Sequence, residues 1–246
     1  MSVPIEGSRV LVTGAGRGLG QVLSRTLVER GASVVYGGAR DPASVTTPGV
    51  TPVRLDITSD ADAEAAVARC ADVSILINNA GIMRGTAQIE APDMDSARAE
   101  MEANYFGMLR MCRAFAPVLG RNGGGALVNI LSIVSWFANP TNSTYCAAKS
   151  AQWSLTNAAR IELRRQGTLV TGVFAGVIDT EMGSFFSDLP KISPESVARQ
   201  VLDGIAAGAE EILCDDRTRA VKANLPHDLT AIYPPFQERW DAAHPV

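Results

Sequence analysis

Histidine and cysteine are scarce in this chain of 246 residues. Its two histidines, His227 and His244, both lie near the carboxyl end. A zinc site or a Ser-His-Asp hydrolase is therefore poorly supported, and we predict no metal site. The cysteines are Cys70, Cys112, Cys146 and Cys214, and they form no C-x-x-C pair. Such spacing is typical of free thiols in a reducing compartment.

Long apolar runs and an excess of positive charge are also missing. No apolar run approaches the length of a membrane-spanning helix. The first residues lack the basic and apolar pattern of a signal peptide, so we expect a cytoplasmic protein with no membrane partner. The chain has 22 Lys and Arg against 26 Asp and Glu, a net charge of −4. This balance gives no electrostatic case for binding nucleic acid.

A glycine-rich segment follows the first short apolar run. The run at 9–12 precedes Gly14, Gly18 and Gly20, and apolar residues at helical spacing follow at 22–28. This order predicts a strand, a glycine turn and a helix. Glycines let the backbone approach a phosphate closely, and the start of a helix offers free N–H groups to it. The spacing is G-x-x-x-G-x-G, and an ordinary βα loop is the alternative interpretation.

Strand-like and helix-like segments alternate along the chain. We expect buried parallel strands at 9–12, 34–36, 53–55, 74–77, 126–130, 169–174 and 211–214. We expect helices near 22–28, 60–71, 93–119, 144–166 and 194–207, with a surface loop at 41–52. This alternation predicts an α/β fold: a single doubly wound Rossmann-type domain over 1–246, with a seven-stranded parallel sheet flanked by helices. It includes a substrate loop at about 181–195 and a tail at about 216–246.

Tyr145 and Lys149 stand four residues apart and therefore share one face of a helix, with Ser132 thirteen residues upstream. A nearby cation favours the ionised phenol, so we expect a lowered pKa for Tyr145. A phenol that exchanges protons near neutral pH can serve as a general acid or base. Taken alone, the pair is better interpreted as an exposed feature of a helix surface.

Taken together in this order, these motifs resemble the classical short-chain dehydrogenase/reductase family over about residues 5–215. The segment 78–81 is similar to the N-N-A-G turn of that family. The segment 176–180 resembles its P-G-x-x-x-T motif, with Ala175 in place of proline. The resemblance implies hydride transfer between a nicotinamide and a carbonyl compound or secondary alcohol. Family members usually assemble as homotetramers or homodimers, through helices that correspond here to 93–119 and 144–166.

The resemblance also assigns roles to individual residues. Tyr145 exchanges a proton with the substrate oxygen, Ser132 holds that oxygen, and Lys149 lowers the pKa of Tyr145 and binds the nicotinamide ribose. Asn104 fixes a water in a proton path, although a helix asparagine packed in a bend is the alternative. The implied cofactor-binding residues are Gly14, Arg17, Gly18, Leu19, Gly20, Arg40, Asp56, Ile57, Asn79, Ala80, Gly81, Tyr145, Lys149, Ile178 and Thr180.

The end of the second predicted strand indicates which nicotinamide cofactor is preferred. An acidic residue at this place selects NAD, but no carboxylate appears before Asp41. Arg40 can bind a ribose 2′-phosphate with its planar guanidinium, and Arg17 offers a second cation. We predict NADP(H), with NAD(H) as the alternative if both arginines are only solvated surface charges.

Apolar residues follow both Ser132 and Thr180, and they favour an apolar or aromatic carbonyl compound as the substrate. They are Ile133, Val134, Trp136, Phe137, Met182, Phe185, Phe186 and Leu189. The first alternative is a 3-oxoacyl-thioester reductase, for which Arg160, Arg164 and Arg165 could dock an acidic carrier. A solvated helix face is the simpler interpretation of these arginines. The second alternative is a dinucleotide-sensing protein without catalysis, which the presence of the whole Ser-Tyr-Lys set disfavours.

Overall fold

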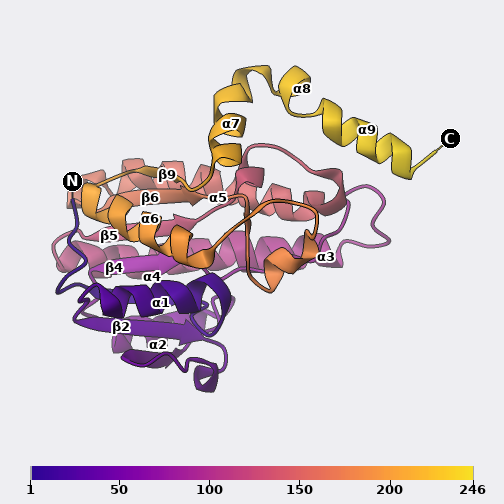
Figure 1. The fold of residues 1–246 in the computed structure, drawn as a ribbon. Coiled ribbons are helices and arrows are strands. Elements are labelled where there is room, and N and C mark those ends of the chain that lie inside the picture. Colours follow the sequence, from indigo (N-terminus) through magenta and orange to yellow (C-terminus); the bar gives the residue numbers. More distant parts are fainter. Residues whose placement is uncertain (1, 246) are drawn as a thin grey trace.

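The fold is described from a computed structural model, which describes residues 2–245. Within them, seven strands form one parallel sheet in the order β3-β2-β1-β4-β5-β6-β9 (Figure 1), as the sequence predicts. The strands are β1 (Arg9–Thr13), β2 (Val34–Ala39), β3 (Val50–Arg54), β4 (Ile75–Asn78), β5 (Ala126–Ile130), β6 (Leu169–Phe174) and β9 (Glu211–Leu213). A separate parallel pair is formed by β7 (Val177–Ile178) and β8 (Lys191–Ile192).

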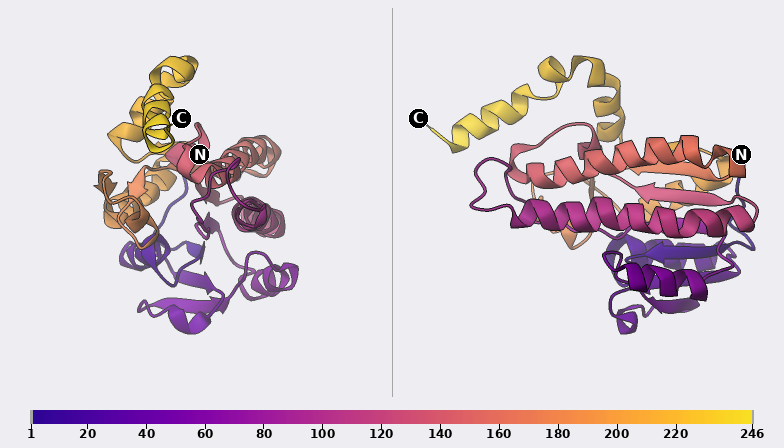
Figure 2. Two further views of the ribbon diagram at one scale, coloured as in Figure 1. Left: turned by 90° about the vertical axis from the view of Figure 1, so that its right-hand side faces the viewer. Right: turned by 180° about the vertical axis from the view of Figure 1, so that it is seen from behind.

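Helices cover both faces of the sheet (Figure 2). The first six are α1 (Gly18–Glu29), α2 (Asp60–Arg69), α3 (Asp95–Glu100), α4 (Gly107–Arg121), α5 (Ser143–Glu162) and α6 (Pro194–Ala207). Helices α1 and α6 pack on one face, and α2, α4 and α5 pack on the other. The tail consists of α7 (Asp216–Asn224), α8 (Asp228–Ala231) and α9 (Pro234–Ala243), and α9 projects from the body (Figure 1).

The alternation of side chains along the strands divides the core into two layers. In β1, Val10 and Val12 pack against α1 and α6, whereas Leu11 packs against the opposite helices. Their neighbours in β4 follow the same rule, because Val10 pairs with Ile75 and Leu11 with Leu76. Successive residues of a strand point to opposite faces of the sheet. Both faces are apolar, so these strands read as continuous hydrophobic runs.

The sequence predicts one continuous helix over 93–119, and this prediction is wrong. The structure has α3, then a π-helical segment at Met101–Phe106, then α4. The wider π-turn interrupts the regular ladder of hydrogen bonds, and such turns are frequent at functional sites. It carries Asn104, so the irregularity falls on a predicted site residue.

The surface loop predicted over 41–52 is also too long, because β3 starts at Val50. Pro52 lies inside this strand, opposite Gly37 of β2. Proline cannot donate a backbone hydrogen bond, but β3 forms the edge of the sheet, where one side needs no partner. β7, β8 and the three tail helices are not predicted by the sequence pattern.

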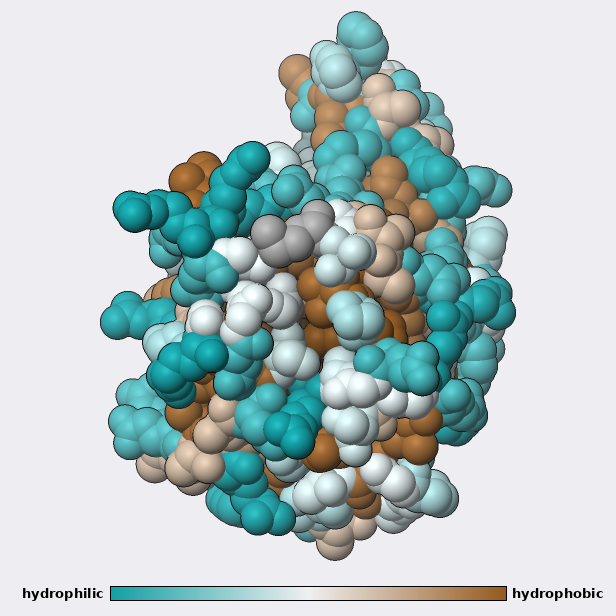
Figure 3. All heavy atoms as spheres, turned by 90° about the vertical axis from the view of Figure 1, so that its left-hand side faces the viewer, coloured by the Kyte–Doolittle hydropathy of each residue, from teal (hydrophilic) through white to brown (hydrophobic). Residues whose placement is uncertain are grey.

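Loops that follow the carboxyl ends of the strands carry the predicted site. The opposite, amino-terminal edge is rimmed by hydrophilic side chains around a small apolar area (Figure 3). In α/β sheets ligands bind beyond the carboxyl ends of the strands, so the chemistry is sought there. Among residues 2–245, no helix has both the length and the apolar character needed to cross a bilayer.

Candidate active site

The glycine turn after β1 brings the backbone into unusually close contact with itself. Gly14 has a φ of 70° and Gly18 a φ of 54°, which side-chain-bearing residues rarely adopt. A Cβ at Gly20 would collide with the carbonyl oxygen of Gly14. Because glycines stand at these positions, no side chains cover the backbone where α1 begins.

The start of α1 is suited to an anion. Arg17 occupies the N-cap position, and within the described residues no side chain hydrogen-bonds to the first turn as a cap. The N–H groups of that first turn therefore face outward, at the positive end of the helix dipole. A dinucleotide pyrophosphate fits this arrangement, in which backbone and not side chains would make the contact.

The 78–81 turn is tied directly to the glycine turn. Asn79 Nδ2 donates to the carbonyl oxygen of Thr13 at 2.9 Å. Thr13 Oγ1 accepts from the backbone N–H groups of Asn79 and Ala80, each at 3.0 Å. A Cβ at Gly81 would lie 2.8 Å from Asn104 Oδ1, so this turn also touches the π-helical segment. The structure thus brings three predicted motifs to one place.

The segment after β6 lies across the glycine turn. Thr180 approaches Gly18, with its Cβ 3.6 Å from where a Gly18 Cβ would be. Gly176 donates its N–H to Asp215 Oδ2 at 2.7 Å, and Asp215 also caps α7. Ala175, which replaces the family proline, accepts from the Ile133 N–H at 2.9 Å. Asp215, which the sequence motifs do not reveal, thus fixes this loop where proline is absent.

The side chains around the end of β2 favour a binding site for the ribose 2′-phosphate. Arg40 is exposed, and the carboxylate of Asp41 is turned to its own loop, where it accepts from the Ala43 N–H at 3.0 Å. Ser44, which the sequence analysis missed, lies against Gly16 of the glycine turn. Arg17 does not point to this group, because it forms an exposed ion pair with Glu181.

The remaining predicted cofactor residues are placed as follows. Asp56 accepts a hydrogen bond from the N–H of Thr58 at 2.9 Å. This bond lowers the pKa of Asp56, and the charges of Arg40 and Arg54 lower it further. Leu19 and Ile57 are buried, so only their backbones could meet a ligand. Ile178 packs at the edge of the core.

The predicted acid/base residues share one face of α5. Lys149 is buried, its Nζ donates to the Ile130 carbonyl oxygen at 3.0 Å, and it lies 5.6 Å from the ring centre of Tyr145. Two residues after Ile130, Ser132 Oγ accepts from the Val134 N–H at 3.3 Å. Lys149 and Ser132 are therefore both anchored at the end of β5, and Lys149 lies one helical turn after Tyr145 on α5.

Asn104 is held by both its side chain and its backbone. Its amide donates to the Ile82 carbonyl oxygen and accepts from the Ile82 N–H, each at 2.9 Å. Its carbonyl oxygen, exposed by the π-turn, accepts from Gln152 Nε2 at 2.5 Å. Gln152 lies three residues after Lys149 on α5 and was missed in the sequence, where it resembles any helix glutamine.

The expected lowering of the Tyr145 pKa is wrong for this structure. Burial, together with the charges of Cys146 and Glu100, raises the pKa of Tyr145. Burial also lowers the pKa of Lys149, to about 7. The reason is desolvation, which disfavours the charged form of both groups. The Lys149 ammonium donates to the Ile130 carbonyl oxygen and lies over the Tyr145 ring, 5.6 Å from its centre.

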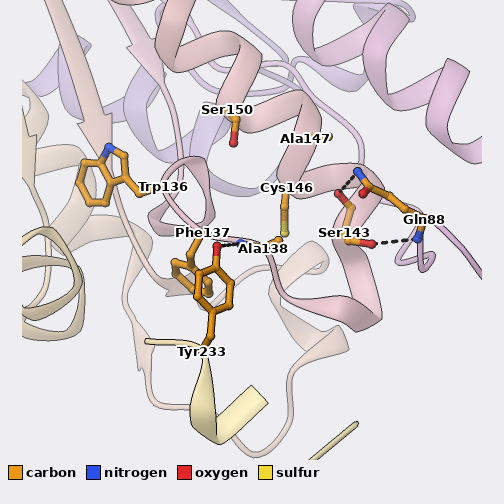
Figure 4. Close-up of a pocket in the computed structure, with 9 residues that line it drawn as sticks. All are labelled: Gln88, Trp136, Phe137, Ala138, Ser143, Cys146, Ala147, Ser150 and Tyr233. Carbon is orange, nitrogen blue, oxygen red and sulfur yellow. Dashed lines mark hydrogen bonds between the residues drawn. The ribbon is translucent and has the colours of Figure 1, made fainter. Parts of the chain in front are cut away.

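A cavity of about 200 Å³ lies on the neighbouring face of α5, under the tail (Figure 4). Trp136, Phe137 and Cys146 line it, with Tyr233 from the tail. Trp136 also stacks on Phe174 in the core, with ring centres 4.2 Å apart. Trp136 and Phe137, which were expected in a substrate pocket, thus line this cavity, and Phe137 also packs against Phe236 of the tail. Burial raises the pKa of Cys146 to about 11, which makes its thiol unreactive.

The fold and this arrangement define a dinucleotide-binding α/β protein of the oxidoreductase type. The family model for short chain dehydrogenase matches residues 8–189. The chain belongs to the short-chain dehydrogenase/reductase family, as the sequence motifs predict.

Individual relatives are similar over most of the chain. The 3-oxoacyl-[acyl-carrier-protein] reductase FabG of Salmonella typhimurium is 30% identical over 216 residues, covering 84% of this chain and 87% of that protein. A short chain dehydrogenase from Burkholderia cenocepacia J2315, solved in complex with NADP, is 41% identical, with a TM-score of 0.88 over 96% of this chain and 99% of that one. A 3-ketoacyl-(acyl-carrier-protein) reductase from Brucella melitensis, complexed with NADH, is 25% identical, with a TM-score of 0.79 over 87% of this chain and 99% of that one.

Proposed function

We propose that the chain is an NADP(H)-dependent reductase of carbonyl compounds that also oxidises secondary alcohols, with an apolar or aromatic ketone as substrate. The observation that carries this proposal is the pairing of Tyr145 and Lys149 on one face of α5, at the edge where the glycine turn starts α1. The raised pKa of Tyr145 keeps the phenol protonated at neutral pH. That is the state a proton donor to a carbonyl oxygen needs.

Each residue has a defined task in this proposal. The bound nicotinamide supplies the hydride, and the protein supplies position and protons. Tyr145 donates its proton to the carbonyl oxygen during reduction and removes a proton from the alcohol during oxidation. Ser132 hydrogen-bonds the same oxygen and holds it in place. Lys149 binds the nicotinamide ribose, and Asn104 positions Lys149 through its bond to Gln152 on the same helix.

Two observations support NADP(H) as the cofactor. Arg40 is exposed at the end of β2, and the nearby carboxylate of Asp41 is occupied by its own loop. The Burkholderia relative binds NADP, although the more distant Brucella relative binds NADH. Arg17 would have to leave Glu181 to assist, so Arg40 is the main determinant in this proposal.

The preference for an apolar substrate depends on the segment after Thr180. Met182 and Phe185 are exposed there, and the ring of Phe185 lies against Gly85 of the loop that follows β4. Exposed apolar side chains beside a predicted reaction centre favour contact with an apolar molecule.

Following NADPH oxidation by the purified protein with aliphatic ketones, aromatic ketones, sugars and 3-oxoacyl thioesters tests the proposal. We expect turnover with the ketones and little with the sugars. A protein that binds NADPH but reduces none of these compounds would instead act as a dinucleotide sensor, and the proposal would be abandoned.

A 3-oxoacyl-thioester reductase is the second candidate, favoured by the 30% identity to the FabG reductase. The carrier-docking patch expected for it is smaller than the sequence indicated. Arg160 donates to the backbone carbonyl oxygens of Val170 and Glu210, so it does not belong to a solvent-facing patch. Arg164 and Arg165 remain exposed. A kcat/KM for carrier-linked thioesters at least tenfold above that for simple ketones would favour this candidate.

A further inference from the structure

The segment 179–190 connects β7 to β8 and is tied together at its two ends. The two strands pair in parallel, and Asp179 donates its N–H to the Ile192 carbonyl oxygen at 2.9 Å. Lys191 Nζ also lies 3.6 Å from Asp179 Oδ1. The segment therefore leaves the body of the protein and returns to it at one fixed place.

Between these ends, the segment touches two other parts of the predicted site. Thr180 lies against Gly18 of the glycine turn, and the carboxylate of Glu181 forms an ion pair with the guanidinium of Arg17. At Gly85, which has a φ of 67°, a Cβ would lie 2.9 Å from the ring of Phe185. The segment thus reaches from the glycine turn to the loop that follows β4.

The backbones that carry the ion pair between Glu181 and Arg17 are both held in place. Ser184 Oγ donates to the Glu181 carbonyl oxygen at 2.7 Å. Arg17 is the N-cap residue of α1, and its carbonyl oxygen accepts from the Gln21 N–H at 3.2 Å. The two side chains are 75% and 76% exposed, so they can change partners without breaking these backbone contacts.

Arg17 also lies close in the chain to the predicted site for the 2′-phosphate. Gly14 and Ala15, just before it, donate their N–H groups to the Gly38 carbonyl oxygen of β2, at 2.8 and 3.1 Å. The end of β2, where we expect the 2′-phosphate, therefore adjoins the glycine turn. An arginine side chain has several rotatable bonds, so that of Arg17 can turn either to Glu181 or toward the end of β2.

The carboxylate of Glu181 and a phosphate would use the same groups of Arg17. Within residues 2–245, no other carboxylate lies within 4.0 Å of an Arg17 side-chain nitrogen. A guanidinium binds carboxylates and phosphates with one planar set of N–H groups. A phosphate that takes these N–H groups must displace the carboxylate, so breaking the ion pair reduces the free energy gained by binding the phosphate.

We propose that Glu181 is a specificity-determining residue, which competes with the ribose 2′-phosphate of NADP(H) for the guanidinium of Arg17. NAD(H) has no such phosphate, so its binding leaves the ion pair in place. This inference rests on the proposed binding of NADP(H) and adds a residue that limits the preference for it. Glu181 weakens the binding of NADPH in this arrangement, whereas Arg40 strengthens it.

The Glu181→Gln variant tests this competition, because it removes the charge and keeps the length of the side chain. We expect the Kd for NADPH, measured by fluorescence titration at low ionic strength, to fall about threefold, an effect of the size found for exposed ion pairs. The Kd for NADH should stay within about 1.5-fold of the wild-type value. Equal Kd values for NADPH in the two proteins, or an equal fall for both cofactors, would overturn the proposal.

Glu195→Gln is the matched control. Glu195 forms an exposed ion pair with Arg25 further along α1, with 3.0 Å between Oε1 and Nη2. The variant therefore makes the same change of charge away from Arg17, and both Kd values should match those of the wild type. An equal fall of the NADPH Kd in this control would mean that net charge sets the affinity, and the competition would be rejected.

The Arg17→Gln variant separates competition from direct repulsion between Glu181 and the phosphate. It should weaken NADPH binding by itself, and adding Glu181→Gln to it should change the Kd no further, because no guanidinium remains to be released. A gain in affinity that persists in the double variant would contradict the proposal, as would an Arg17→Gln variant that binds NADPH as tightly as the wild type.

All of these readouts are binding constants, which separates this inference from the proposed function. A protein that binds NADPH but reduces no ketone would end the proposed function, and the Kd values of the Glu181 and Arg17 variants would still decide whether the competition exists. Conversely, a turnover of ketones with NADPH that depends on Tyr145 would stand even if Glu181→Gln left both Kd values unchanged.

Discussion

The segment from 9 to 81 and the segment from 82 to 195 differ in the chemical groups that form their predicted sites. In the first, backbone groups and glycines shape the predicted cofactor site, as in the approach of Gly20 to Gly14. In the second, buried polar side chains shape the predicted reaction centre. Glu100, Asn104 and Lys149 are all buried there.

This difference has an energetic consequence. A backbone site leaves its donors for an incoming phosphate without burying a charge. The reaction centre must bury groups that prefer water, which costs free energy of folding and shifts their pKa values. The shifts at Tyr145 and Lys149 occur in the second segment, whereas the first acquires only the lowered pKa of the half-buried Asp56 among the predicted site residues. The two segments should therefore respond differently to substitution.

The largest expected effect is a loss of turnover without a loss of cofactor binding. Tyr145→Phe removes only the hydroxyl, so kcat should fall by about three powers of ten or more, because no other group can replace the donated proton. The Kd for NADPH, measured by fluorescence titration, should change by less than about threefold, since the glycine turn is untouched. Near-normal turnover in this variant would show that Tyr145 is not the proton donor.

Local sequence patterns predict more of the structure of the first segment than of the second. The glycine turn, the sheet and α6 follow from periodicity and from turn residues, which act locally. The π-turn at Asn104 and the role of Gln152 depend on contact between the π-helical segment at Met101–Phe106 and α5, which no local pattern records. The pKa of Tyr145 was predicted in the wrong direction because spacing shows which residues are neighbours but not how deeply they are buried.

The tail gives a second example of this limit. Its helices have no strong apolar periodicity, and Ile232 and Tyr233 pack in one cluster with Phe137 of the body. Asp215 likewise looks like an ordinary helix cap, although it also holds Gly176. Such double roles arise only when distant segments meet in the folded chain.

A smaller effect is expected in the first segment. Arg40→Ala should lower kcat/KM for NADPH by about tenfold and leave the value for NADH unchanged, because only NADPH carries the 2′-phosphate. Arg69→Ala is the matched control, since it removes the same charge from an exposed residue at the far end of α2. An equal loss for both cofactors would mean that Arg40 supports the fold and does not select the phosphate.

The smallest expected effect is on stability, which should rise in a variant that loses its function. Lys149→Met should abolish turnover yet raise the free energy of unfolding at pH 6 by on the order of 1 kcal/mol, because a buried charge is replaced by an apolar chain of similar length. The lowered pKa of Lys149, about 7, lies below its ordinary value of 10.5. The unfolded chain therefore binds one more proton than the folded protein between these two values.

The stability of the wild type consequently gains from this residue as the pH rises from about 7 toward 10.5. The advantage of Lys149→Met over the wild type should then be largest below pH 7 and shrink toward alkaline pH, as measured by urea unfolding across this range. The raised pKa values of the buried thiols affect both proteins equally and cancel in the difference. A constant difference at every pH would mean that Lys149 stays charged in the folded protein, and the contrast between the two segments would lose its energetic basis.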